Sequence, residues 1–280
     1  MRRPKRKLNS QTSAGSKSRR SVVIIGASGG IGRALLESYR GEPVSIYATA
    51  NERYDELCQY ARKSVAAAEY LSITALRANV ARMEDIDRLV ETLLNRLSVD
   101  QGGGSPRIDE LAIAFGIDLM TPKAKALSFD ARLEQALRVD LYATAVLARR
   151  LGNVMRLEAA EQKRDRAPAI ALFSWDGVQT GRGGESSLIY GATKGGVAGF
   201  ARSLAKELAP WVRVNTVSPG WIATTWGRTA PEEVRERCAK DSLLNRWGEA
   251  AEVANVVRFL LSEDASYVNG QEIAVNGGRS

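Results

Sequence analysis

Short stretches rich in β-branched residues alternate with longer segments of helical periodicity from residue 21 almost to the end of the 280-residue chain. Repeated strand-helix-strand units of this kind build a parallel sheet whose two faces are covered by the helices. The sequence therefore predicts an α/β fold, a doubly wound Rossmann-type parallel sheet in a single domain. The predicted strands are residues 22–25, 44–48, 72–76, 111–114, 169–173, 212–217 and 272–275.

The net charge of +8 is concentrated in the first 20 residues, which contain eight Lys or Arg and no Asp or Glu. The rest of the chain holds 32 basic and 32 acidic residues. A segment rich in Ser, Lys and Arg cannot bury enough apolar surface to fold, so residues 1–20 are expected to be a disordered tail before a domain at 21–280. A polyanion-binding arm and an organelle-targeting peptide are the alternatives for the tail. The balanced remainder argues against a nucleic-acid partner.

Several classes of protein are disfavoured by composition. No run of about 18 apolar residues exists, and the first 20 residues lack the apolar middle of a secretory signal, so a cytoplasmic protein without a membrane segment is expected. Cys58 and Cys238 are the only cysteines and lack metal-ligand spacing, which fits a reducing compartment. The absence of histidine excludes His-based catalysis, and no metal site is expected.

A glycine cluster follows the first predicted strand and leads directly into a helix, in the segment VVIIGASGGIGRAL at residues 22–35. A dinucleotide pyrophosphate needs a tight turn, a backbone free of side chains and the N–H groups of a helix N-terminus. A tight turn without a ligand is the alternative interpretation. The cofactor-binding residues predicted in this turn are Gly26, Ser28, Gly30, Ile31 and Gly32.

The end of the second predicted strand reads Thr49-Ala50-Asn51. Sites that select NAD usually have a carboxylate there, which binds the ribose 2′-hydroxyl. No carboxylate stands at this place to repel a 2′-phosphate, and Arg53 or Arg33 is available to bind one. The pattern favours NADP(H) over NAD(H).

Tyr190 and Lys194 lie four residues apart at the start of a predicted helix, in the segment SLIYGATKGG at residues 187–196. This spacing places the phenol and the ammonium on one face of the helix. A free tyrosine titrates near pH 10, and a nearby lysine favours the phenolate. In isolation, such a pair is more simply explained by packing on a helix surface.

The chain from residue 21 to 278 resembles the classical short-chain dehydrogenase/reductase (SDR) family. The matching pieces are the turn at 26–32 (TGxxxGxG in the family), Ser174, Tyr190 with Lys194 (YxxxK), residues 213–224 (RVNxVxPGxIxT), and the segments 246–248, 252–254 and 269–278 near the C-terminus.

The resemblance implies an NAD(P)(H)-dependent oxidoreductase that moves hydride between nicotinamide and a carbonyl or secondary alcohol substrate. It implies that Tyr190 is the general acid, that Lys194 binds the nicotinamide ribose and tunes Tyr190, and that Ser174 hydrogen-bonds the substrate oxygen. A homo-oligomer, tetramer or dimer, is implied as well. The further cofactor-binding residues implied are Thr49, Asn79, Val80, Ala114, Gly116, Pro219, Gly220, Ile222 and Thr224, together with Tyr190 and Lys194.

The sequence departs from the family pattern at three places. The NNAG motif reads Ile113-Ala114-Phe115-Gly116, and Asn79 replaces the usual Asp. Asp140 stands where the family has the Asn of the catalytic set. If that Asn acts through its backbone, Asp140 is harmless. If its side chain matters, the carboxylate competes for the Lys194 ammonium and weakens the tuning of Tyr190.

Two further interpretations compete with an active carbonyl reductase. One is a non-catalytic dinucleotide-binding module whose basic tail binds a partner, and the other is a sugar-nucleotide epimerase, which the short chain and residues 219–224 disfavour. The Gly-rich interval 175–189 is expected to be a mobile loop beside the substrate. Trp221, Trp226 and a helix at 231–240 are expected to form the opposite wall and to favour an apolar or ring-shaped substrate, unless the tryptophans serve core packing.

Overall fold

The computed structural model describes residues 19–66, 70–164 and 166–279, and for Trp226 the backbone alone. Seven strands form one sheet in the order β3-β2-β1-β4-β5-β6-β7, and every neighbouring pair is parallel. This arrangement confirms the predicted doubly wound α/β fold. The strands are β1 (Arg20–Ile25), β2 (Val44–Ala50), β3 (Ser72–Arg77), β4 (Glu110–Ile113), β5 (Ala169–Phe173), β6 (Arg213–Pro219) and β7 (Glu272–Val275).

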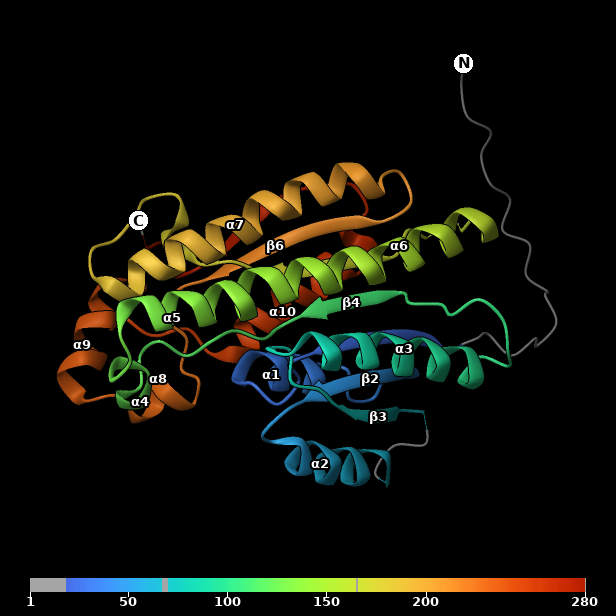
Figure 1. Cartoon of the computed structure of the whole chain (residues 1–280), viewed down its shortest axis with the longest axis horizontal. Coiled ribbons are helices and arrows are strands. Elements are labelled where there is room, and N and C mark those ends of the chain that lie inside the picture. Colours follow the sequence, from blue (N-terminus) through green and yellow to red (C-terminus); the bar gives the residue numbers. More distant parts are fainter. Residues whose placement is uncertain (1–18, 67–69, 165, 280) are drawn as a thin grey trace, which may run out of the picture.

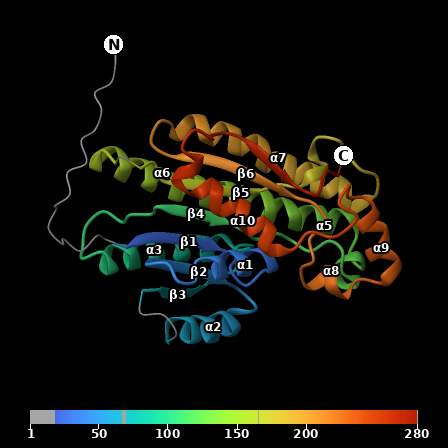
Figure 2. The same cartoon turned by 180° about the vertical axis from the view of Figure 1, so that it is seen from behind.

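Helices cover both faces of the sheet, as Figures 1 and 2 show from opposite sides. Apolar side chains of α1, α2 and α10 pack on one face, and those of α3, α6 and α7 pack on the other. None of the described helices is long and apolar enough to cross a membrane. The helices are α1 (Gly30–Ser38), α2 (Tyr54–Ala66), α3 (Met83–Asp100), α4 (Pro122–Lys125), α5 (Phe129–Ala136), the π-helical η1 (Leu137–Ala143), α6 (Thr144–Gln162), the short η2 (Asp176–Val178), α7 (Glu185–Leu208), α8 (Thr225–Thr229), α9 (Glu232–Lys240), α10 (Ala250–Leu261) and η3 (Glu263–Ala265).

The strand order reverses between β1 and β4, because the chain winds outward from β1 in one direction and from β4 in the other. Loops that leave the carboxyl ends of these two strands diverge and leave a crevice, where ligands of such sheets bind. The short helices α4, α8 and α9 gather at one end of the molecule, at the left of Figure 1. The fold therefore places the glycine turn after β1 and the segment after β4 side by side.

Several strand ends differ from the predicted ones. Residues 1–18 of the predicted tail lie outside the described residues, and Arg20 already belongs to β1. β2 runs two residues further than predicted, because Ala50 is still paired with Arg77 of β3. β4 begins at Glu110, a charged residue that sequence patterning assigns to a loop.

The burial of Glu110 is explained by its partners at the amino end of the sheet. Its side chain is 1% exposed, and its Oε1 accepts hydrogen bonds from Arg20 at 2.6 Å and Arg166 at 2.9 Å. Oε2 accepts a bond from the Tyr39 hydroxyl and lies 3.4 Å from an Arg258 nitrogen. A buried carboxylate is tolerated when it is paired and hydrogen-bonded in this way.

We expect Glu110→Ala to lower the free energy of unfolding by about 3 kcal/mol, because three partly buried arginines lose the one buried carboxylate that they share. Urea denaturation measures the change. Glu161→Ala is the matched control, since Glu161 is an exposed residue near the end of α6. Equal stabilities of the two variants would contradict the role assigned to Glu110.

Candidate active site

The turn between β1 and α1 contains three glycines that no other residue can replace without a shift of the neighbouring atoms. Gly26 has φ +93°, and an added Cβ would lie 2.8 Å from the Ala114 oxygen. A Cβ on Gly32 would lie 2.2 Å from the Gly26 oxygen, and one on Gly30 would lie 2.7 Å from Thr224 Cγ2. No side chain caps the N-terminus of α1, so the N–H groups of its first turn are available to an anion. The turn therefore fits a dinucleotide pyrophosphate.

A cavity of about 280 Å³ lies beside this turn, between the ends of β1, β2 and β4. Four of the predicted cofactor-binding residues, Gly30, Gly32, Lys194 and Asn79, line neither this cavity nor the cavity beside Tyr190 described below. The Oδ1 of Asn79 accepts a hydrogen bond from Ala81 N at 3.1 Å within its own turn. Its neighbours on both sides line the cavity. The predicted residues that line it are Gly26, Ser28, Thr49, Val80, Ala114 and Gly116.

Glu52 and Arg53 also line this cavity, and the carboxylate of Glu52 was missed by the sequence argument. β2 extends to Ala50, and this length brings residues 51–53 together to the cavity. Arg33 is turned elsewhere: it pairs with Glu37 at 2.9 Å, and its guanidinium lies 3.7 Å from the Tyr60 ring centroid. Arg53 alone of the two predicted arginines therefore reaches the cavity.

The four predicted catalytic residues are joined by a continuous series of contacts through the segment after β4. Ser174 follows β5, Tyr190 and Lys194 lie on α7, and Asp140 lies on η1. Ser174 Oγ donates to the Lys194 carbonyl at 3.0 Å, and Lys194 Nζ lies 3.4 Å from Asp140 Oδ1. Asp140 Oδ1 accepts from Ile117 N at 2.9 Å. The Tyr190 hydroxyl donates to the Ile117 carbonyl at 3.1 Å.

The Tyr190 phenol is held at the rim of a cavity by backbone groups. Besides its bond to Ile117, its oxygen accepts a hydrogen bond from Leu119 N at 3.3 Å. Burial raises the pKa of Tyr190 well above its ordinary value, the negative charge of Asp140 raises it further, and the Leu119 bond lowers it. Tyr190 is therefore protonated at neutral pH, the state that a proton donor needs.

The Asp140 carboxylate is completely buried against the Lys194 ammonium. Gly116 makes this approach possible, because a Cβ there would lie 3.1 Å from Asp140 Oδ1 and 3.3 Å from Lys194 Nζ. Asp140 Oδ2 finds no hydrogen-bond partner among the described residues. Of the two possibilities stated for Asp140, this geometry corresponds to the one in which the carboxylate engages the ammonium.

The hydroxyl of Ser174 differs from its expected orientation. Its side chain is buried, is engaged with the Lys194 carbonyl, and does not line the cavity that Tyr190 lines. A bond from Ser174 to a substrate oxygen therefore requires its hydroxyl to leave that carbonyl.

The cavity beside Tyr190 has a volume of about 730 Å³, within the range of small-molecule sites. Its aromatic wall is formed by Trp175, whose ring centroid lies 6.0 Å from that of Tyr190, and by Trp221 and Trp247. The side chain of Trp226 lies outside the described residues. The predicted cofactor-binding residues that line this cavity are Ile31, Tyr190, Pro219, Gly220, Ile222 and Thr224, of which Ile222 and Thr224 were predicted to contact the nicotinamide.

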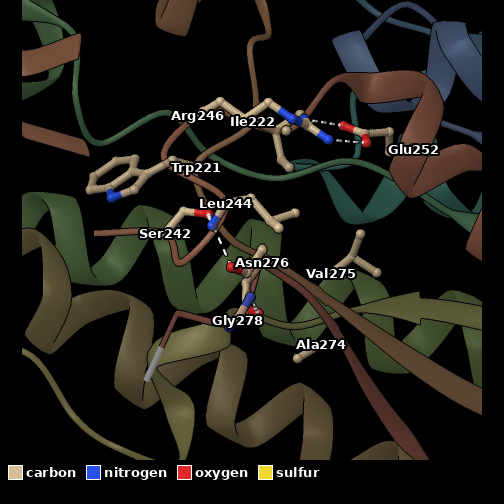
Figure 3. A pocket seen from close by; sticks show the side chains of 12 residues that line it. Trp221, Ile222, Ser242, Leu244, Arg246, Glu252, Ala274, Val275, Asn276 and Gly278 are labelled. Carbon is tan, nitrogen blue, oxygen red and sulfur yellow. Dashed lines mark hydrogen bonds and ion pairs between the residues drawn. The ribbon is translucent and has the colours of Figure 1, made fainter. Parts of the chain in front are cut away.

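A second, smaller cavity of about 210 Å³ shares Trp221 and Ile222 with this one (Figure 3). Ser242 Oγ donates to the Gly277 carbonyl at 3.0 Å there, and Arg246 pairs with Glu252 at 2.7 Å. The Ser242 bond holds the segment after β7 in place, and the Arg246 pair ties the loop before α10 to that helix.

Comparisons with known proteins agree with this architecture. The family model described as enoyl-(acyl carrier protein) reductase matches residues 26–280. The chain is 33% identical over 261 residues to a 3-oxoacyl-[acyl-carrier-protein] reductase FabG of Aquifex aeolicus, which covers 91% of this chain and 95% of the relative. A solved short-chain dehydrogenase/reductase of Brucella melitensis, titled glucose/ribitol dehydrogenase, has a TM-score of 0.74 and 30% identity over 93% of this chain and 96% of that one. The chain belongs to the short-chain dehydrogenase/reductase family.

Membership in the short-chain dehydrogenase/reductase family makes the chain an NAD(P)-dependent oxidoreductase, as its motifs indicate. A second solved structure, angucycline C-6 ketoreductase LanV with bound NADP, has a TM-score of 0.76 and 25% identity over 93% of this chain and 95% of that chain.

Proposed function

We propose that this chain reduces a ketone carbonyl with NADPH and that Tyr190 donates the proton. The observation that carries the proposal is the cavity that Tyr190 lines together with Ile31 of the glycine turn and Thr224 of the segment after β6. The relatives named 3-oxoacyl-[acyl-carrier-protein] reductase support a 3-oxoacyl thioester or a similar ketone as substrate.

Bound NADPH supplies the hydride, and the side chains of this chain manage the charge that develops on the substrate oxygen. Tyr190 gives its proton to that oxygen, which takes the place of the Ile117 carbonyl as acceptor. The Leu119 N–H keeps its hydrogen bond to the Tyr190 oxygen and stabilises the phenolate that forms, because a hydrogen bond to the charged form lowers the pKa of the phenol. The Ser174 hydroxyl, once it leaves the Lys194 carbonyl, is the second donor to the substrate oxygen.

The preference for NADPH over NADH depends on two adjacent side chains. Arg53 offers a cation to a 2′-phosphate, while Glu52 offers a carboxylate that repels one. The arginine makes no ion pair with any described residue, so its charge is available. The relative LanV, solved with NADP, supports the same preference. The ratio of kcat/KM for the two cofactors measures it directly.

The proposed reaction is tested by following NADPH absorbance with 3-oxobutanoyl and 2-butenoyl thioesters as matched substrates. We expect turnover of the 3-oxo compound and none of the enoyl compound. Turnover of the enoyl compound alone would contradict ketone reduction and indicate enoyl reduction, the activity named in the family model's description. NADPH binding without turnover of any ketone in a panel would favour the non-catalytic module.

Asp140→Asn should shift the pH dependence of the reverse reaction, alcohol oxidation, to lower pH by about one unit. Oxidation needs the Tyr190 phenolate, so its rate rises with pH through the pKa of Tyr190. Asp140 raises that pKa by its charge, and its removal lowers it and also releases Lys194. Asp118→Asn is the matched control, because Asp118 raises the same pKa less and its backbone bonds are retained by Asn. A midpoint that stays or rises in Asp140→Asn contradicts this role.

We also propose that the chain forms a dimer or tetramer, as the family resemblance implies. Analytical ultracentrifugation of the full chain measures the assembly.

A further inference from the structure

The substrate cavity beside Tyr190 carries more positive charge than its proposed reaction needs. Lys125, Arg182, Arg237 and Arg279 line it, against Glu185 as the only acidic lining residue among the described ones. Reduction of a neutral ketone requires no cation at a distance from the reacting oxygen. The excess therefore points to the non-reacting part of the substrate.

Part of this charge is neutralised by carboxylates behind the wall. Arg279 lies 3.3 Å from Asp176 and 3.4 Å from Asp241, and its guanidinium is 4.7 Å from the Trp221 ring centroid. Arg182 lies 3.9 Å from the same buried Asp176. Asp176 and Asp241 together balance these two guanidinium groups, so the lining cations left without a carboxylate are Lys125 and Arg237.

The acidic lining residue, Glu185, is neutralised as well. It pairs with Arg132, whose side chain is 5% exposed. Lys125 and Arg237 make no ion pair with any described residue. When Arg132, Asp176 and Asp241 are counted with the charged lining residues, five positive groups stand against three negative ones.

The hydrogen-bonding capacity of the wall is also incomplete. The Nε atoms of Arg182 and Arg279 are buried and have no hydrogen-bond partner among the described residues. Because these Nε atoms are inaccessible, an anion in the cavity would meet the terminal nitrogens of Arg182, whose side chain is 22% exposed, and of the exposed Arg237. Charge-assisted hydrogen bonds of this kind are about twice as strong as neutral ones. The three tryptophans of the same cavity supply an apolar surface between these cations and Tyr190.

We propose that the substrate is a ketone that also carries a carboxylate, with the carbonyl at Tyr190 and the carboxylate against Arg182 and Arg237. This inference rests on the proposed reduction of a ketone and, for the same site, favours an oxo acid over the 3-oxoacyl thioester of the relatives. The tryptophan surface accommodates the carbon skeleton between the two polar ends. An oxo acid bound in this way is held at both ends, which orients its carbonyl.

The test compares oxo acids with their neutral methyl esters in a series where one to five carbons separate the carbonyl from the carboxyl group. We expect kcat/KM with NADPH to be at least about tenfold higher for the best acid than for its ester, the effect of one charge-assisted hydrogen bond. Arg237→Gln should reduce this acid-to-ester ratio by about the same factor. High salt should reduce the ratio as well, because the arginine is exposed.

Arg235→Gln is the matched control, since Arg235 lies on the same helix, is also exposed, and does not line this cavity. Its acid-to-ester ratio should equal that of the unaltered chain. A ratio near one in the unaltered chain, or the same fall in Arg235→Gln as in Arg237→Gln, overturns the proposal.

Calorimetric binding of the acids and esters separates this proposal from the proposed reaction. Acids that bind more tightly than their esters but are not turned over support the carboxylate site and contradict ketone reduction. Turnover of ketones without a preference for acids in either assay contradicts the carboxylate site alone. Preference for a coenzyme A thioester over both acid and ester would assign the cations to the phosphates of a carrier group and would also overturn the proposal.

Discussion

Tyr190→Phe should lower kcat for ketone reduction by about 1,000-fold, within the range of 10²–10⁴ that a positioned proton donor contributes. The phenylalanine ring keeps the contact with Trp175 and loses only the hydroxyl that reaches the Ile117 carbonyl. Steady-state turnover with saturating NADPH measures the change. Because Tyr190 donates its proton to the substrate oxygen as the hydride is transferred, the loss should appear in kcat rather than in the affinity for the cofactor.

The control for Tyr190→Phe is Tyr142→Phe, which removes a hydroxyl from an exposed tyrosine on η1. Its turnover should match that of the unaltered chain. The Tyr190 variant must also bind NADPH with little change, which shows that the fold has survived the loss of two hydrogen bonds. Undiminished turnover in a folded Tyr190→Phe protein would remove Tyr190 from the mechanism.

Gly32→Ala should weaken NADPH binding by about 100-fold, equivalent to two steps of 1.4 kcal/mol. The added Cβ would meet the Gly26 oxygen at 2.2 Å, so the turn must open and the N-terminus of α1 must move from the place where the pyrophosphate binds. Titration of the protein with NADPH, followed by calorimetry, measures the loss.

Gly199→Ala is the matched control, because an added Cβ at this position on α7 meets nothing within 4 Å. Its affinity for NADPH should be unchanged. Thermal denaturation of both variants distinguishes a local change in the turn from general unfolding. Equal affinity of Gly32→Ala and Gly199→Ala would show that the glycine turn does not hold the cofactor.

The fold could be predicted from the sequence because its signals are local. Each strand is a short apolar run, each helix has its own periodicity, and alternation of the two leaves few topologies for a parallel sheet. The predicted strand ends were wrong where contacts with residues distant in sequence override the local sequence pattern. Glu110 reads as a loop residue until Arg20 and Arg166, both distant in sequence, are brought to it.

The candidate site was predictable to the extent that its residues are close in sequence. Gly26, Gly30 and Gly32 lie in one turn, and Tyr190 and Lys194 lie on one helix, so their spacing indicates their geometry. The side chain of Glu52 was missed because its relevance depends on where β2 ends, which pairing with β3 decides.

The sequence by itself determined the parallel sheet, the glycine turn and the Tyr190–Lys194 helix, because each depends on neighbouring residues whose geometry follows from helical or strand periodicity. Only the tertiary structure decided that Asp140 lies against Lys194, that the Tyr190 hydroxyl meets the backbone at residues 117 and 119, and that Arg182 and Arg279 share Asp176. The residues in these contacts are between 6 and 103 positions apart in the sequence. No periodic pattern in the sequence indicates which side chains will meet when such segments pack.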